Sequence, residues 1–148
     1  MNPKRLNAES KFYNEISECP LEITASYIRR NSIGTPELSV SCKNNSDKTI
    51  DAFTVSFYCY DNFNNPVNKY GYGGNALPAI AQVKISSGGT HDGNYYWWTA
   101  YGYENTTKYK AYITEIHFTD NTTWEMSQAS IINAKMYTDQ IINNITFG

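Results

Sequence analysis

The sequence predicts an all-β fold: an antiparallel β-sandwich of about seven strands, flanked at both ends by short helical or irregular segments. Apolar and polar residues alternate over much of residues 19–126, which is the pattern of strands with one buried face. Clusters of Asn, Asp, Gly and Ser interrupt these runs at the spacing that is typical of a sandwich. No repeat of about 20 to 50 residues is present, so a solenoid or a propeller is not predicted.

The first 18 residues are expected to form a flank or linker that precedes the sandwich. Leu6, Phe12 and Ile16 recur near helical spacing among polar residues, which indicates either a short, weakly amphipathic helix or a linker. The predicted boundaries are therefore 1–18 for the flank, 19–126 for the sandwich domain and 127–148 for a C-terminal tail. Apolar residues of the tail have a spacing that fits a helix about as well as an extra strand.

Within the sandwich domain, alternation predicts the strands and turn-forming residues predict the breaks. Leu21 to Tyr27 alternates strictly, and residues 31–36 end this strand in a loop. The further expected strands are residues 37–43, 49–60, 82–85, 108–118 and 123–126. The glycine-rich stretch 71–75 predicts a loop, and Asp120-Asn121 predicts a tight hairpin between the last two strands.

Composition argues against two classes of partner. The chain has 12 Lys and Arg against 14 Asp and Glu, so it lacks a basic surplus that would neutralise a phosphate backbone, and no nucleic acid is expected. Its most apolar run, residues 76–81, contains a proline and is far shorter than the roughly 20 residues of a membrane span, so no span is expected.

The N-terminus does not have the pattern of a signal peptide. Polar residues follow the basic N-terminus where a signal peptide needs an apolar core. The chain is therefore expected in the cytoplasm or, if it is excised from a longer exported chain, outside the cell or in the envelope.

The three cysteines, Cys19, Cys42 and Cys59, are expected to be buried free thiols. Their number is odd, and their spacing is not that of a zinc ribbon or a redox motif. Cys42 and Cys59 each end an alternating run, which places both on apolar strand faces. If residues 45–47 turn one strand back along the next, Cys59 lies roughly 30 Å beyond the position opposite Cys42. A disulfide needs Cα atoms within about 7 Å, so this pair is not expected.

Two stretches resemble a recurring bacterial domain pattern. Residues 38–61 combine a strand, the turn Asn44-Asn45-Ser46, a second strand and a Tyr60-Asp61 turn, as in immunoglobulin-like domains of the FxLYD type. Residues 98–124 resemble, more narrowly, an uncharacterised Firmicutes domain family. The resemblance covers about residues 21–125 and implies an immunoglobulin-like β-sandwich exposed outside the cell. It implies no activity, because it brings no catalytic residues to this chain.

Histidines and carboxylates give weak signals of catalysis. His91-Asp92 lies in a glycine-flanked loop, where it could bind a metal, act as a base or form a solvated turn. An enzyme built on His91, Asp92 and Asp120 requires these residues to converge within about 10 Å. His117 is expected to be a cross-strand partner on the face that it shares with Glu115. Because nucleophile elbow, zinc spacing and phosphate loop are all missing, we predict a protein that is not an enzyme and that holds no cofactor or metal.

The turns rich in Asp and Asn are compatible with a calcium site. Oxygen ligands of the kind that Ca²⁺ prefers come from Asp61, Asn62, Asn64, Asn65 and Asp120. Tight turns use the same residues, and no Asp-Xaa-Asp-Xaa-Asp-Gly loop is present. Structural turns and a calcium site therefore both fit these residues.

Aromatic density is the one feature of the sequence that points to recognition. The candidate ligand-binding residues are Tyr72, Tyr95, Trp97, Trp98 and Tyr103. Flat rings on a rigid sandwich can stack on sugar faces while Asn and Asp side chains bind hydroxyl groups. Core packing is the competing interpretation, since adjacent Trp97 and Trp98 in a strand point to opposite faces and one of them then fills the core.

These observations together favour a non-catalytic interaction module, envelope-associated or secreted, of a Gram-positive bacterium. The abundance of residues with AT-rich codons fits such a source. Its partner is expected to be a protein or a cell-wall glycan, and the alternative function is a carbohydrate-binding module that uses the aromatic and Asn-rich loops. Apolar residues near the termini, such as Ile131, Ile132, Ile141 and Ile142, also allow a homo-oligomer.

Overall fold

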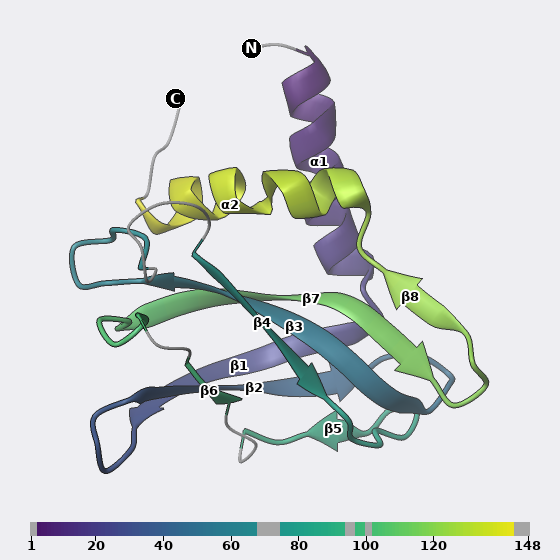
Figure 1. Cartoon of the computed structure of the whole chain (residues 1–148). Helices are drawn as coiled ribbons and strands as arrows, with labels where there is room; N and C mark the ends of the chain where they lie inside the picture. Colours follow the sequence, from purple (N-terminus) through teal and green to yellow (C-terminus); the bar gives the residue numbers. More distant parts are fainter. Residues whose placement is uncertain (1–2, 68–74, 94–96, 100–101, 144–148) are drawn as a thin grey trace.

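The computed structural model describes residues 3–67, 75–93, 97–99 and 102–143 (Figure 1). Two antiparallel sheets pack face to face, and a helix lies at each end of the chain. This confirms a mostly β sandwich with flanking segments. Among the described residues, the N-terminal helix is α1 (Pro3–Glu18) and the C-terminal helix is α2 (Gln128–Ile142).

Each sheet is built from strands that pair in an antiparallel manner. In sheet A the order is β1-β2-β5, and β6 also pairs with β2; in sheet B it is β4-β3-β7-β8. The strands of sheet A are β1 (Leu21–Arg30), β2 (Pro36–Asn44), β5 (Thr90–His91) and β6 (Trp97–Trp98). Those of sheet B are β3 (Ile50–Tyr60), β4 (Ala76–Ala81), β7 (Lys108–Phe118) and β8 (Thr123–Glu125).

The turn after β2 carries the chain from one sheet to the other. Residues 45–47 therefore do not form a hairpin, the condition under which the Cys42–Cys59 distance was considered, because β2 pairs with β1, β5 and β6, whereas β3 pairs with β4 and β7. Buried Asn44 explains the difference: its Nδ2 atom donates to the carbonyls of Lys48 (2.8 Å) and Ile85 (2.9 Å), and its Oδ1 atom accepts from the Ser46 amide (3.0 Å). These bonds stabilise a corner between the two sheets instead of a hairpin with a β-ladder. The three cysteines are free and buried, as predicted.

The main core fills the space between the two sheets. Alternating residues of two strands contribute much of it: Phe53, Val55, Phe57 and Cys59 from β3, and Leu38, Val40 and Cys42 from β2. Burial of one such aliphatic or aromatic side chain contributes about 1.5–3 kcal/mol. The period-two pattern of the sequence therefore identifies the core-facing side of both strands correctly.

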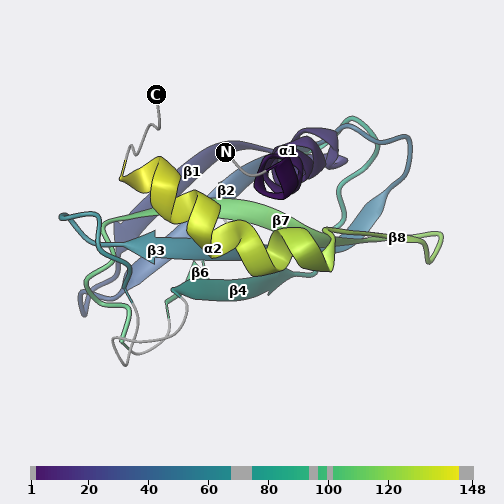
Figure 2. The same ribbon diagram turned by 90° about the horizontal axis from the view of Figure 1, so that it is seen from above.

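Sheet B buries its other face against the two helices. This second cluster consists of Phe12 from α1, Tyr58 and Tyr60 from β3, Tyr112 from β7, Met126, and Ala134 and Tyr137 from α2. The rings of Phe12 and Tyr112 meet edge to face, with centroids 5.3 Å apart. The Tyr60 hydroxyl donates to Asp139 Oδ1 at 2.5 Å. Figure 2 shows the result, a third layer in which α2 lies over β3 and β7.

β4 occupies Ala76–Ala81, so the strand predicted at residues 82–85 is wrong. Of that stretch, Ile85 makes an isolated bridge with Ile50. β4 contains Pro78, and it is an edge strand that pairs on one side with β3. An edge position tolerates proline because the missing amide faces away from the ladder.

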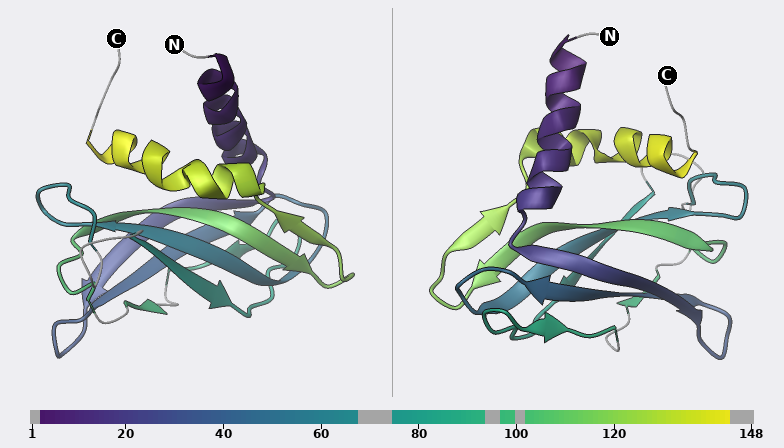
Figure 3. Two further views of the ribbon diagram at one scale, coloured as in Figure 1. Left: turned by 45° about the horizontal axis from the view of Figure 1, so that its top comes forward. Right: turned by 180° about the vertical axis from the view of Figure 1, so that it is seen from behind.

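Both flanking segments are helical, and the C-terminal tail folds back onto its own sandwich. Figure 3 shows α1 standing beside the first turns of α2. The Glu15 carboxylate of α1 accepts hydrogen bonds from the Ser127 amide (3.2 Å) and hydroxyl (3.0 Å), and from the Ser130 hydroxyl. Ser127 is also the N-cap of α2, so an acidic side chain from one helix caps the other. Neither of the described helices has the length and apolar character needed to cross a membrane.

Candidate functional site

The structure describes part of the predicted aromatic site. Tyr72 and Tyr95 lie outside the described residues, as does the side chain of Trp98, whose backbone belongs to β6. The structure places Trp97 and Tyr103 half-buried against the main core. An aromatic platform made of these five residues therefore stays a prediction.

The two described rings connect the edge strand β4 to the rest of the sandwich. Trp97 Nε1 donates to the Ile80 carbonyl at 3.1 Å, and the Trp97 ring lies 5.6 Å from the Phe57 ring. The Tyr103 hydroxyl donates to the Ala76 carbonyl at 3.4 Å. These contacts give both side chains a role in packing, because each bonds to one end of β4.

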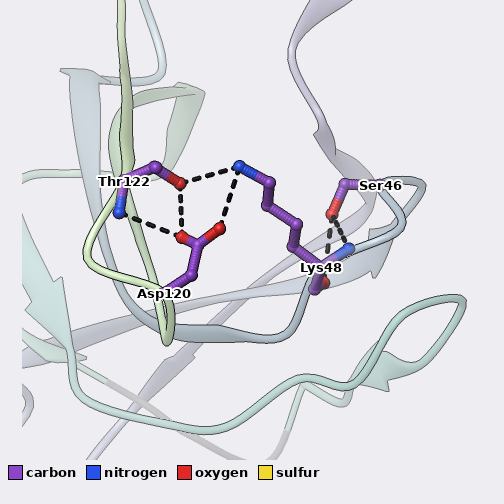
Figure 4. Close-up of polar contacts among 4 residues, drawn as sticks. All are labelled: Ser46, Lys48, Asp120 and Thr122. Carbon is purple, nitrogen blue, oxygen red and sulfur yellow. Dashed lines mark hydrogen bonds and ion pairs between the residues drawn. The ribbon is translucent and has the colours of Figure 1, made fainter.

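Asp120, which the sequence offers for catalysis or calcium binding, joins two turns (Figure 4). Its carboxylate accepts from the Thr122 hydroxyl (2.5 Å) and amide (3.0 Å), and it pairs with Lys48 Nζ at 3.1 Å. Hydrogen bonds from Thr122, together with the Lys48 ammonium, lower the pKa of Asp120 to about 2. The ammonium therefore neutralises the carboxylate that a calcium site would use, and it connects the β2–β3 turn to the β7–β8 turn.

His91 has different surroundings from Asp120. It lies in β5, and its ring meets the ring of Phe53 edge to face at 5.6 Å in the main core. Burial lowers the pKa of His91, which favours its neutral form. Within the described part of the chain, no group of three or more His, Cys, Asp and Glu residues is arranged to hold a metal.

His117 has a partner that the sequence did not identify. Its Nδ1 atom lies 2.6 Å from Asp51 Oδ1 across the β3–β7 pair. The register of this pair shifts between Ile50 and Ala52, which leaves Asp51 as an extra residue in a bulge. The sequence predicts a cross-strand partner for His117, but simple alternation does not anticipate a bulge and therefore does not identify Asp51 as that partner. Both side chains are partly exposed, and the pair is accessible on the surface.

The strongest candidate site is a cavity between α1, β1 and β7, which we call the edge groove. Its volume is about 440 Å³, within the usual range of ligand pockets. The walls are Tyr13, Ile16 and Cys19 on the α1 side, residues 21–26 of β1, residues 110–113 of β7, and Ile141 of α2. Figure 3 shows α1 leading into β1, with β7 running beside β1.

The edge groove forms because two strand edges from different sheets face each other without pairing. β1 is the last strand of sheet A on this side. β7 pairs with β8 through Glu115, Ile116 and His117, and residues 110–113 have no strand partner on that edge among the described residues. Backbone N–H and C=O groups alternate between the two sides of a strand, so about half of those in each wall point away from the paired neighbour. The edge groove therefore offers hydrogen-bonding backbone as well as apolar side chains.

The wall residues give the edge groove an apolar interior and a charged rim. Ile113 is buried, and Ile23 and Ala111 pack against the main core. Of the two charged residues that line the groove, Glu22 accepts a hydrogen bond from Asn45 Nδ2 at 3.0 Å. The other is exposed Lys110, whose side chain has no hydrogen bond or ion pair with the described residues. An anionic group at this rim would therefore find an uncommitted cation.

Sequence reasoning missed the edge groove because its walls come from four segments that are far apart in the chain. The sequence signal that fits it lies in β1, where the alternation that starts at Leu21 ends at Tyr27 and is followed by Ile28-Arg29-Arg30. In the structure, residues 26–30 are all exposed. A strand that loses its buried face in this way is an edge with little cover. Alternation alone does not show which second strand lies opposite it.

Comparison with known proteins places this architecture in a wider group. A solved structure of a hypothetical protein from Peptoclostridium difficile 630 shares the fold, with a TM-score of 0.62 and 14% sequence identity over 86% of this chain and 98% of that chain. No curated protein matches the sequence. A family model described as a family of unknown function, DUF5780, matches residues 37–144, from β2 to the end of α2 and beyond. Because this match covers most of the sequence, the chain belongs to the DUF5780 family.

Proposed function

We propose that this chain is a non-catalytic interaction module of a Gram-positive cell envelope, and that it binds its partner in the edge groove. The observation that carries the proposal is the cavity of about 440 Å³ between two unpaired strand edges. The immunoglobulin-like relationship to FxLYD-type domains, and an exported parent chain, are parts of the same proposal. The similar structure from a Firmicutes bacterium supports the fold on which it rests.

The walls of the edge groove are suited to binding because they are held rigidly. Ile113 and Leu21 are buried in the main core, so the strands that carry them are fixed from behind. Phe12 is fully buried in the second cluster, which fixes the helix that carries Tyr13 and Ile16. A preorganised cavity loses little conformational entropy when a ligand enters it.

Of the two expected partners, a protein fits the edge groove better than a cell-wall glycan. Unpaired strand edges provide regularly spaced N–H and C=O groups, which match a peptide backbone. The carbohydrate-binding alternative depends on stacking rings, and the two described rings, Trp97 and Tyr103, pack against the core. A homo-oligomer stays a separate prediction, for which Ile132 on α2 offers a side chain that is 68% exposed.

The test measures binding of the labelled chain to isolated envelopes of the bacterium that encodes it. Thr24 lines the groove and is exposed, so Thr24→Trp fills the cavity without entering the core. Thr90→Trp is the matched control, because Thr90 is an exposed strand residue in β5, which pairs with β2 rather than lining the groove. We expect Thr24→Trp to bind at least tenfold more weakly than the wild type, and Thr90→Trp to bind equally well.

Treatment of the envelopes identifies the class of partner. Proteinase treatment is expected to abolish sedimentation of the chain with the envelopes, whereas digestion of the glycan strands by a muramidase is expected to leave binding to the released protein. Loss of binding on muramidase digestion alone would instead support the carbohydrate-binding alternative. Equal binding of the wild type and Thr24→Trp, or no binding by either, refutes the proposed use of the edge groove.

A further inference from the structure

We infer that the occupant of the edge groove is a short, extended peptide segment that adds to the open edge of β1 and places a carboxylate on Lys110. This inference rests on the proposed function and specifies its partner. It joins three independent features of the groove: the open backbone edge, the bulge that interrupts it and the uncommitted charge at its rim.

The open edge of β1 provides the hydrogen bonds for an added strand. β1 pairs with β2 along its whole length, from the Leu21–Asn44 pair to the Arg30–Pro36 pair. Its other side faces the edge groove, where strand addition would satisfy the outward N–H and C=O groups. At the far end of β1, the Arg30 guanidinium donates to the carbonyls of Glu104 (3.0 Å) and Thr106 (3.0 Å), so the residues just before β7 lie beside this end. An added strand therefore occupies the end of β1 that lines the groove.

A bulge in β1 limits how long the added strand can be. The register of the β1–β2 pair shifts between Ile23 and Ala25, so Thr24 interrupts the regular alternation. A continuous ladder cannot cross such a bulge without its own irregularity. The segment of β1 that lines the groove has six residues, which is about 20 Å of strand. We therefore expect a ligand of about four paired residues rather than a long strand.

Charge complementarity selects the chemistry of the ligand. Lys110 shares a strand face with Tyr112, the face on which α2 lies, and it lines the groove together with Ile141 of α2. Glu22, on the opposite wall, accepts a hydrogen bond from Asn45 and keeps its negative charge, so an anion is attracted at the Lys110 side of the groove and repelled at the Glu22 side. An acidic side chain or a terminal carboxylate would pair with Lys110, while apolar residues of the same segment contact Ile23 and Ile113.

The test begins with a phage-displayed library of random octapeptides, selected on the full chain and counter-selected on Thr24→Trp. We expect enriched sequences with β-branched residues at alternate positions and an Asp or Glu at a fixed position. One enriched peptide is then synthesised in three forms: unmodified, with the acidic residue changed to its amide, and with alternate backbone nitrogens methylated. Binding is measured by calorimetry, and its location by NMR shifts of the labelled chain.

Lys110→Met should weaken binding of the acidic peptide about three- to tenfold and leave the amide form unchanged, because it removes only the charge. Lys43→Met is the matched control, since Lys43 is an exposed strand lysine outside the groove. Methylation of the backbone nitrogens should abolish binding. Peptides that bind the groove without an acidic residue, or that tolerate methylation, overturn this inference while the proposed function stands. If no peptide is enriched although envelope binding still depends on Thr24, the peptide inference is overturned and the proposed function stands.

Discussion

The carboxylate of Glu15 is predicted to stabilise the packing of α1 against α2. It accepts hydrogen bonds from the Ser127 amide and hydroxyl and from the Ser130 hydroxyl, all at the first turn of α2. A hydrogen bond to a charged group contributes a net stabilisation of about 1.5–3 kcal/mol when it is buried. Glu15 is half-buried and water can replace its partners, so we expect Glu15→Gln to lower the free energy of unfolding by about 1 kcal/mol.

The pH dependence of this effect follows from the pKa of Glu15. Burial alone would raise the pKa, but hydrogen bonds from Ser130 and Ser127 and the charge of Lys11 outweigh it and lower the pKa below the ordinary 4.5. A carboxyl group whose folded pKa is lowered stabilises the protein above its unfolded pKa, and the stabilisation is lost as the pH falls through the folded pKa. The difference between wild type and Glu15→Gln should thus be constant from pH 7 to about pH 5 and shrink below pH 4.5.

Urea denaturation followed by tryptophan fluorescence and by circular dichroism measures this difference at each pH. A loss of 1 kcal/mol corresponds to about 2–4 °C in Tm for a chain of this size. Glu18→Gln is the control, because Glu18 is an exposed acidic residue on the same helix. It should change stability by less than about 0.5 kcal/mol. If Glu15→Gln and Glu18→Gln behave alike at pH 7, or if the Glu15 effect does not change with pH, the reasoning is wrong.

Three further predictions concern groups in the two cores. Tyr60→Phe should cost about 1–2 kcal/mol in urea denaturation, because Asp139 loses the Tyr60 hydroxyl and keeps Lys135; an unchanged midpoint would contradict this. Burial raises the pKa of all three thiols to about 12, so Ellman's reagent should label the folded protein slowly and the unfolded protein at three sites; rapid labelling without denaturant argues against burial. Since burial lowers the pKa of His91, unfolding takes up a proton below pH 6.5, and stability should fall from there with a slope that His91→Gln reduces.

The strands could be predicted from the sequence wherever one face of a strand meets one core. The expected strand at 108–118 has the bounds of β7, and the expected strands at 37–43 and 49–60 lie within β2 and within a residue of β3. Alternation is a local property of a strand, so it predicts the bounds of a strand correctly even where the pairing of that strand is not predicted. Alternation did not identify β4. The edge position of β4, which explains why Pro78 is tolerated, is a property of the whole sheet and not of the local sequence.

The candidate site could not be predicted, because it depends on contacts between distant parts of the chain. Residues 21–26 and 110–113 line one cavity, although alternation describes each segment by itself. Glu15 contacts Ser127 across a sequence separation of 112 residues, and a helical pattern in the sequence does not predict such a contact. The sequence did identify aromatic residues, which are conspicuous in composition, but composition does not say whether a ring such as that of Trp97 fills a core or faces a ligand.

The position of α1 links the stability of the helices to binding in the edge groove. Glu15 bonds to α2, while Tyr13 and Ile16, within one turn of it, line the groove. A ligand that contacts this wall binds the docked helix and not the undocked one, so it stabilises docking by RT ln(1 + [L]/Kd). Reciprocity then requires that weakening the α1–α2 contact weakens binding. Glu15→Gln should therefore raise the apparent Kd of a groove ligand in inverse proportion to the fraction of chains with α1 docked, which is measured by hydrogen exchange at residues 11–17. An unchanged Kd alongside faster exchange would show that α1 is no part of the binding surface.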